Sequence, residues 1–120
     1  MTDPIDAAVF AALVEMTGGE IDFVDELVDT YLEDGRNQLD AMRAAVAAED
    51  DRSLGRAAHS LKSGSLNVGA MGLGELCRAL EEAARSGSVP DASERVAAID
   101  AGFDGARREL LAEREHRAPR

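Results

Sequence analysis

The chain has 120 residues, and its 24 acidic side chains outnumber 13 basic ones, which gives a formal net charge of −11. Hydrophobic residues make up 45% of the chain, enough for one core at this length and too much for a disordered acidic chain. The negative charge excludes nucleic acid and anionic membranes as expected partners, because phosphates require Lys and Arg for neutralisation. Aromatic residues are only 3%, which favours closely packed helices over a β-sandwich.

Cysteine usage and the first residues indicate a cytoplasmic protein. Cys77 is the single cysteine of the sequence and cannot form an internal disulfide. The opening Met-Thr-Asp-Pro lacks the basic flank of a signal peptide. The longest wholly apolar run, residues 7–14, is too short to span a bilayer.

Two helices are predicted in the first half of the chain. The first begins with Asp3 as N-cap and Pro4 as first helical residue, and ends at Gly18. Helical spacing gives it an apolar face of Ile5, Val9, Ala12, Leu13 and Met16. The second helix covers about residues 20–48, and a bend or break is possible at its Gly35. Its apolar stripe consists of Phe23, Leu27, Tyr31, Leu39, Met42 and Val46.

Three more helices follow at about residues 52–67, 72–86 and from the early 90s onward. Acidic residues 49–51 cap the third helix, and Gly87 and Pro90 end the fourth. Asp91 or Ser93 caps the fifth, which should fray into the charged tail at 113–120. Its core positions are Val96, Ile99, Phe103, Leu110 and Leu111.

Short connections between amphipathic helices favour antiparallel neighbours. We therefore expect an all-α fold, an antiparallel up-and-down four-helix bundle with a short extra N-terminal helix. One domain should span residues 1–120, with its core at about 4–112. A single bundle closes its own core, so the chain is expected to be a monomer.

Established cofactor and metal motifs are absent from the sequence. Gly69, Gly72 and Gly74 have the wrong spacing for a phosphate-binding loop, and no Cys/His cluster fits zinc. Glu113 and His116 form one Glu-x-x-His pair, but a di-metal bundle needs two such pairs. We expect no metal site and no intrinsic cofactor.

His59 is the histidine whose position on its helix is informative. At about 100° per residue it lies roughly 160° from Leu61, so it should project outward. The opposite, apolar face comprises Leu54, Ala57, Ala58, Leu61, Ser65 and Val68. The helical neighbours of the imidazole are small, apolar or cationic: Gly55, Arg56, Lys62, Ser63 and Leu66. Cations here could hold phosphoryl oxygens. On geometry alone, an exposed helical histidine beside a lysine is more often an ordinary surface residue than a functional one.

Residues 58–69, Ala-His-Ser-Leu-Lys-Ser-Gly-Ser-Leu-Asn-Val-Gly, are followed by Leu73, Leu76, Cys77 and Leu80-Glu81. This run resembles the signature of the histidine-containing phosphotransfer (HPt) domains of two-component phosphorelays. The resemblance implies that His59 is the phosphoacceptor and that Lys62 helps to neutralise the phosphoryl group. It also implies that Glu81 hydrogen-bonds and orients the imidazole. In a wheel centred on Leu80, Glu81 lies at the margin of the core face formed by Leu73, Leu76, Cys77 and Ala84.

Partners also follow from the resemblance. The chain would accept a phosphoryl group from a receiver aspartate or a kinase and pass it to another receiver, whose acidic pocket would supply Mg²⁺. Gly55, Arg56, Ser63, Gly64 and Leu66 would form the docking face, with Val28 or Leu32 of the second helix beside it. Gly64 would keep that face open, and Gly69 would turn the chain into the next helix. Ser63 stands where the family usually has glycine, which implies an altered partner fit.

Two alternatives stay open from the sequence. The chain could be the phosphoacceptor module of a chemotaxis-type histidine kinase, with which Glu81 is compatible. It could also be a helical adaptor that binds partners without phosphorylation. The chain has no ATP-binding motif, so in the phosphotransfer reading it is a phosphocarrier and not an enzyme.

Overall fold

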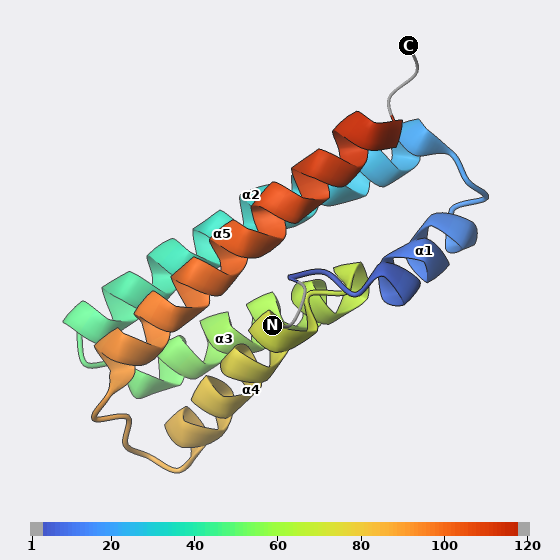
Figure 1. Cartoon of the computed structure of the whole chain (residues 1–120). Helices are drawn as coiled ribbons and strands as arrows, with labels where there is room; N and C mark the ends of the chain where they lie inside the picture. The colour runs from blue at the N-terminus through green and yellow to red at the C-terminus, as the bar shows by residue number, and fades with distance from the viewer. Residues whose placement is uncertain (1–3, 118–120) are drawn as a thin grey trace.

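The computed structural model describes residues 4–117, and all regular secondary structure in this range is α-helical (Figure 1). No helix in the described range is long and apolar enough to cross a membrane. In chain order the helices are α1 (Ala7–Met16), α2 (Ile21–Ala47), α3 (Asp51–Val68), α4 (Met71–Arg85) and α5 (Ala92–Arg117).

Helix α1 begins later than predicted. Its N-cap is Asp6, whose carboxylate accepts hydrogen bonds from the backbone N–H groups of Ala8 and Val9 at 2.9 and 3.3 Å. The prediction of Pro4 as first helical residue is wrong, and Asp3 lies outside the described residues. Met16, expected on the apolar face, is 83% exposed, whereas Phe10 is buried.

Helix α2 runs without interruption through Gly35, so the possible break does not occur. The ring of Phe103 in α5 lies against the Gly35 backbone, where a side chain would overlap it. The buried row passes through Val24 and Val28 and continues to Tyr31. Phe23, predicted in the stripe, is about half exposed, because the row drifts by one residue in the first turns.

Helix α3 matches its prediction closely. The structure buries all six residues of the expected face and no others of this helix. Asp50 caps its start by accepting from the Ser53 backbone N–H at 3.1 Å and the Ser53 hydroxyl at 2.6 Å. Gly69 ends it with a φ of +92°, a conformation that suits glycine. The Gly69 carbonyl also accepts from the Asp6 N–H at 2.7 Å, which ties the start of α1 to the α3–α4 turn.

Helix α4 differs from expectation in the exposure of one residue, and helix α5 differs in how far it extends. Leu76 of α4, expected in the core, is 40% exposed. The tail does not fray at Glu113, because α5 continues to Arg117. Arg114 holds this end in place: its guanidinium donates to the Asp25 carbonyl at 2.8 Å and to the Asp29 carboxylate at 2.7 Å, both on α2.

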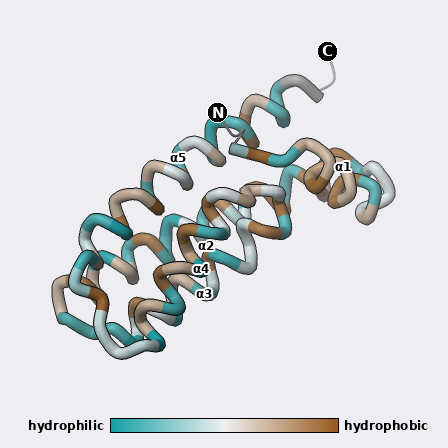
Figure 2. Tube along the Cα trace, turned by 60° about the horizontal axis from the view of Figure 1, so that its bottom comes forward, coloured by the Kyte–Doolittle hydropathy of each residue, from teal (hydrophilic) through white to brown (hydrophobic). Residues whose placement is uncertain are grey.

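The four long helices contact one another in a cycle, α2 with α3, α3 with α4, α4 with α5, and α5 with α2 (Figure 1). Helix α1 contacts α2 and α3 at one end of this assembly. Hydrophobic and hydrophilic positions interleave along the helices (Figure 2), as expected for helices with one buried face.

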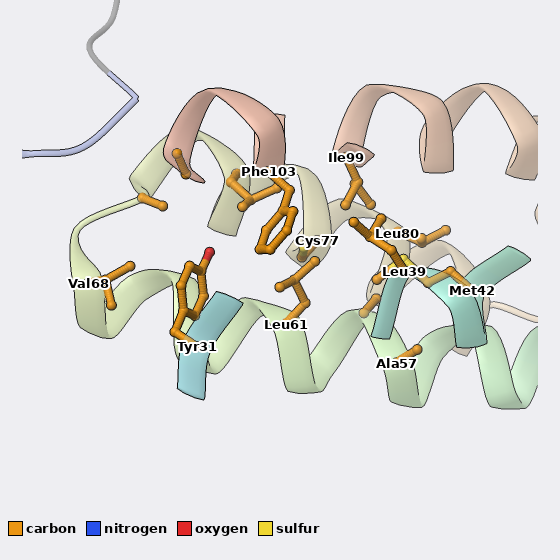
Figure 3. Packing of buried hydrophobic residues seen from close by; sticks show 14 of the residues in the cluster. Tyr31, Leu39, Met42, Ala57, Leu61, Val68, Cys77, Leu80, Ile99 and Phe103 are labelled. Carbon is orange, nitrogen blue, oxygen red and sulfur yellow. The ribbon is translucent and has the colours of Figure 1, made fainter. Parts of the chain in front are cut away.

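The core lies along the axis between the four helices. Figure 3 shows Tyr31 between Val68 and Phe103 in this core, and the ring centroids of Tyr31 and Phe103 are 5.8 Å apart. The Tyr31 hydroxyl pairs with the Ser65 hydroxyl at 2.8 Å, and burial raises the pKa of Tyr31 to about 12. Cys77 is fully buried further along the core, and burial raises the pKa of its thiol to about 12.

Candidate functional site

His59 stands on the outer face of α3, and its side chain is 58% exposed. Its Nδ1 lies 2.7 Å from Oε2 of Glu81 on α4. The neighbouring Ala57 and Ala58 are buried, which fixes the rotation of α3 and turns His59 away from the core. The structure therefore joins two residues that the sequence places 22 positions apart.

The Glu81 carboxylate is shared by cations from both helices. Lys62 Nζ donates to Oε1 at 2.7 Å, while the Arg85 guanidinium lies 3.4 Å from Oε2. The hydrogen bond from Lys62 is the main cause that lowers the pKa of Glu81 from its usual value, and the bond from His59 adds to it. Glu81 is thus held ionised although its side chain is only 13% exposed.

Small residues allow α3 and α4 to approach closely enough for these contacts. A Cβ on Gly55 of α3 would lie 3.0 Å from the Ala84 Cβ of α4. At the other end of the pair, Gly74 of α4 makes room for the Leu66 side chain of α3, whose Cδ2 would lie 2.6 Å from a Cβ there. The helix spacing that positions Glu81 beside His59 is therefore set by these two glycines.

The hydrogen bond defines which imidazole nitrogen is available for chemistry. An ionised carboxylate can only accept, so Nδ1 carries the proton in the neutral ring. Nε2 then keeps its lone pair on a side chain that is largely exposed. The arrangement provides a nucleophile without an enclosing pocket.

The other predicted docking residues divide into two groups. Arg56 and Ser63 are exposed, and Leu66 is 39% exposed, so these three can meet a partner. The Ser63 hydroxyl donates back to the His59 carbonyl at 3.2 Å. Gly64, by contrast, packs against Tyr31, because a Cβ there would lie 3.1 Å from the ring Cδ1.

The prediction of Val28 as an exposed docking residue is wrong, and the sequence analysis missed one apolar surface near Leu66. Val28 is buried, because the core row of α2 runs through it, while Leu32 is half buried. The surface beside Leu66 is instead an open apolar groove of about 610 Å³ between α1, α2 and α3. Val9 and Leu13 supply its α1 side, which helical spacing in α1 could have suggested.

Arg85 is a second feature of the site that the sequence analysis did not predict. It lies four residues after Glu81, one turn along the same helix face, and this spacing was the available signal. Within the described side chains, no group of three or more His, Cys, Asp or Glu residues could hold a metal ion. His116 of the Glu-x-x-His pair lies outside the residues whose side chains are described.

Comparison with known proteins agrees with this geometry. The sequence profile of the Hpt domain matches residues 26–110. No curated protein matches the chain. Among solved structures, the crystal structure of histidine-containing phosphotransfer protein B (HptB) from Pseudomonas aeruginosa PAO1 is similar, with a TM-score of 0.90 and 32% sequence identity. The match covers 98% of this chain and 100% of the HptB chain. The chain therefore belongs to the Hpt domain family.

Proposed function

We propose that this chain is a phosphorelay intermediate and carries the phosphoryl group on Nε2 of His59. As an Hpt protein it is a carrier and not an enzyme. The observation that carries the assignment of His59 is its 2.7 Å contact with Glu81 through Nδ1, which leaves Nε2 unprotonated in the neutral ring. Family membership supports the relay role, and the exposure of the imidazole allows a second protein to reach it.

The transfer step needs no other nucleophile from this chain. The Nε2 lone pair attacks the phosphorus of an aspartyl phosphate on a receiver domain, a P–N bond forms, and the P–O bond to the aspartate breaks. The aspartate leaves as a carboxylate, and the positive charge gained by the ring is shared with Glu81 through the Nδ1 proton. Reversal of these events on a second receiver returns the phosphoryl group.

Lys62 and Glu81 have separate roles in this proposal. Glu81 orients the ring and balances its positive charge. Lys62 Nζ, 22% exposed and held by Glu81, is placed to neutralise phosphoryl oxygens added at His59. The chain needs no cofactor of its own, and Mg²⁺ bound by the receiver would neutralise phosphoryl charge from the other side.

The proposal extends to the architecture and the partners. We take residues 1–120 as one domain whose four long helices form an antiparallel up-and-down bundle, supported by the cyclic contacts and short connections. The partners would be receiver domains and histidine kinases, met by a cytoplasmic monomer without an ATP-binding site.

The test is phosphoryl transfer from a panel of phosphorylated receivers to the wild type, His59→Gln and Ser60→Ala. Ser60 is the exposed neighbour on the same helix and serves as the matched control. We expect acid-labile, alkali-stable label on the wild type and Ser60→Ala, and none on His59→Gln with an unchanged circular dichroism spectrum. Label retained on folded His59→Gln would assign the phosphoryl group elsewhere. No label on the wild type from the whole panel would favour a non-phosphorylated adaptor.

A further inference from the structure

An open hollow of about 570 Å³ lies beside His59, between the first half of α3 and the second half of α4. Gly55 and Ala84, the close-contact pair of these helices, lie among its lining residues. Three guanidinium groups surround it, from Arg52 and Arg56 of α3 and from Arg85 of α4. Of these three arginines, only Arg56 was predicted from the sequence to lie on the docking face.

Carboxylates engage these guanidinium groups less than they engage most other arginines of the helices. Six other arginines of the helices form ion pairs with carboxylates: Arg43, Arg78, Arg95, Arg107, Arg108 and Arg114. Within the described residues, Arg52 and Arg56 are exposed and form no ion pair, although the charge of Arg56 helps to lower the pKa of the Asp50 carboxyl. Arg85 is 73% exposed and makes only the 3.4 Å contact with Glu81.

Carboxylates do not cancel this charge. Two line the hollow, Asp51 and Glu81. Glu81 is already bound by Lys62 and His59, each at 2.7 Å, so it has little capacity left for the arginines. Asp51 is then the one other lining carboxylate, set against Arg52 and Arg56, while Arg85 keeps its 3.4 Å contact with Glu81.

The hollow and the nucleophile share one helix face. Arg56 precedes His59 by three residues and Arg52 precedes it by seven, which places them about 4.5 and about 10 Å away along the axis of α3. Both spacings return to the same side of a helix. A partner whose reacting group sits at His59 must therefore also cover these arginines.

We propose that this arginine hollow, defined by Arg52, Arg56 and Arg85, receives the acidic rim of the receiver's phosphoacceptor site. The inference rests on the proposed function. A protein that holds Mg²⁺ beside a reactive aspartate carries several carboxylates at that place. Guanidinium groups match carboxylates by bidentate, charge-assisted hydrogen bonds. Charge complementarity favours this acidic occupant. The three arginines would repel a basic surface, and an apolar surface would desolvate them at a cost.

The hollow also gives the receiver a fixed orientation. On the far side of His59 along α3 lie Leu66 and the apolar groove, which hold no arginine. The docking surface is thus cationic at the arginines of the hollow and apolar toward the end of α3. A receiver placed the other way round would set its carboxylates on the groove.

The experiment compares Arg52→Glu/Arg56→Glu with Arg36→Glu in transfer from a phosphorylated receiver at increasing receiver concentration. Arg36 is the matched control, because it is exposed on α2, unpaired within the described residues and outside the hollow. Glu is tolerated in the first turns of a helix, so the double variant should fold. We expect its half-saturating receiver concentration to rise roughly ten-fold or more, with a much smaller change in the maximal rate. Added salt should bring the wild type toward the variant.

Each outcome decides between docking and chemistry. Equal half-saturating concentrations for the double variant and Arg36→Glu would overturn the arginine hollow as a receiver contact. A lower maximal rate at unchanged half-saturation would also overturn it, because the arginines would then act in the transfer step. Labelling of His59 by phosphoramidate, a small phosphoryl donor, is measured in parallel. A wild type that takes label from neither donor would instead contradict the proposed function itself.

Discussion

His59 and Glu81 meet at 2.7 Å through the imidazole nitrogen that faces α4, so the exposed part of the ring is left for a partner. The contact joins the last turn but one of α4 to the middle of α3. It makes Glu81 a link between two helices and, in the proposed function, a support of the nucleophile.

The link predicts how stability depends on pH. The pKa of Glu81 is lowered from 4.5, chiefly by the Lys62 hydrogen bond. A carboxyl whose pKa is depressed by folding contributes stability above its unfolded value and loses it as the pH falls through its folded value. The melting temperature of the wild type should therefore exceed that of Glu81→Gln at pH 7, and the difference between the two melting temperatures should narrow below pH 4.5. Thermal unfolding of both proteins across this range measures it, and a constant gap would contradict the assignment.

Lys62→Ala should slow transfer far more than it lowers the melting temperature. The ammonium is partly exposed, and Glu81 keeps its contacts with His59 and Arg85 when Lys62 is removed, so the loss of stability should be modest. The phosphoryl group loses a neutralising charge, and we expect the rate to fall roughly ten-fold or more. Rapid-quench transfer at saturating receiver gives the rate, with Lys62→Arg as the charge-retaining control. Equal rates for Lys62→Ala and the wild type would remove the role of Lys62.

Gly35→Ala should destabilise the protein, although alanine is the better helix former by about 1 kcal/mol. A Cβ at this position would overlap the Phe103 ring, which is buried against Tyr31 and cannot move freely. Overpacking of this kind costs about 1–3 kcal/mol. Gly72→Ala is the control, because nothing lies within 4 Å of a Cβ there. In urea unfolding, the free energy of unfolding of Gly72→Ala should equal or exceed that of the wild type, and that of Gly35→Ala should be lower.

The Tyr31 and Ser65 hydroxyls should be coupled in a double-mutant cycle. Each is buried and pairs with the other at 2.8 Å. Tyr31→Phe or Ser65→Ala leaves one buried hydroxyl without this partner, at a cost of about 1–3 kcal/mol. The double variant leaves neither, so its loss in unfolding free energy should be smaller than the sum of the single losses. Strict additivity would show that the contact contributes no coupling.

The sequence predicted the inward face of α3 fully, because residues 54–68 combine a regular apolar period with polar residues on the remaining positions. Period alone was insufficient in α2 and α4. Phe23 and Leu76 fit the helical spacing, but the neighbouring helices do not cover them. Burial at such positions depends on where a second helix lies, which one helical wheel does not contain.

The same limit explains the site. Glu81 was assigned to His59 through the family resemblance, and the wheel placed it only at the margin of α4. The arginine hollow depends on the rotation and distance of α3 against α4, which the Gly55–Ala84 contact sets in three dimensions. The start of α1 was predicted at Asp3, whereas the structure caps this helix with Asp6, whose N–H donates to the Gly69 carbonyl, 63 positions away in the chain.

The buried thiol makes the chain convenient for spectroscopy. Cys77 has no exposed surface, and burial raises the pKa of its thiol to about 12, so alkylating reagents at neutral pH meet almost no thiolate. A cysteine introduced in place of the exposed Ser60 would then take a fluorophore or spin label alone, without removing the native cysteine. Because position 60 adjoins His59, the signal of that label would report the proposed receiver docking in real time.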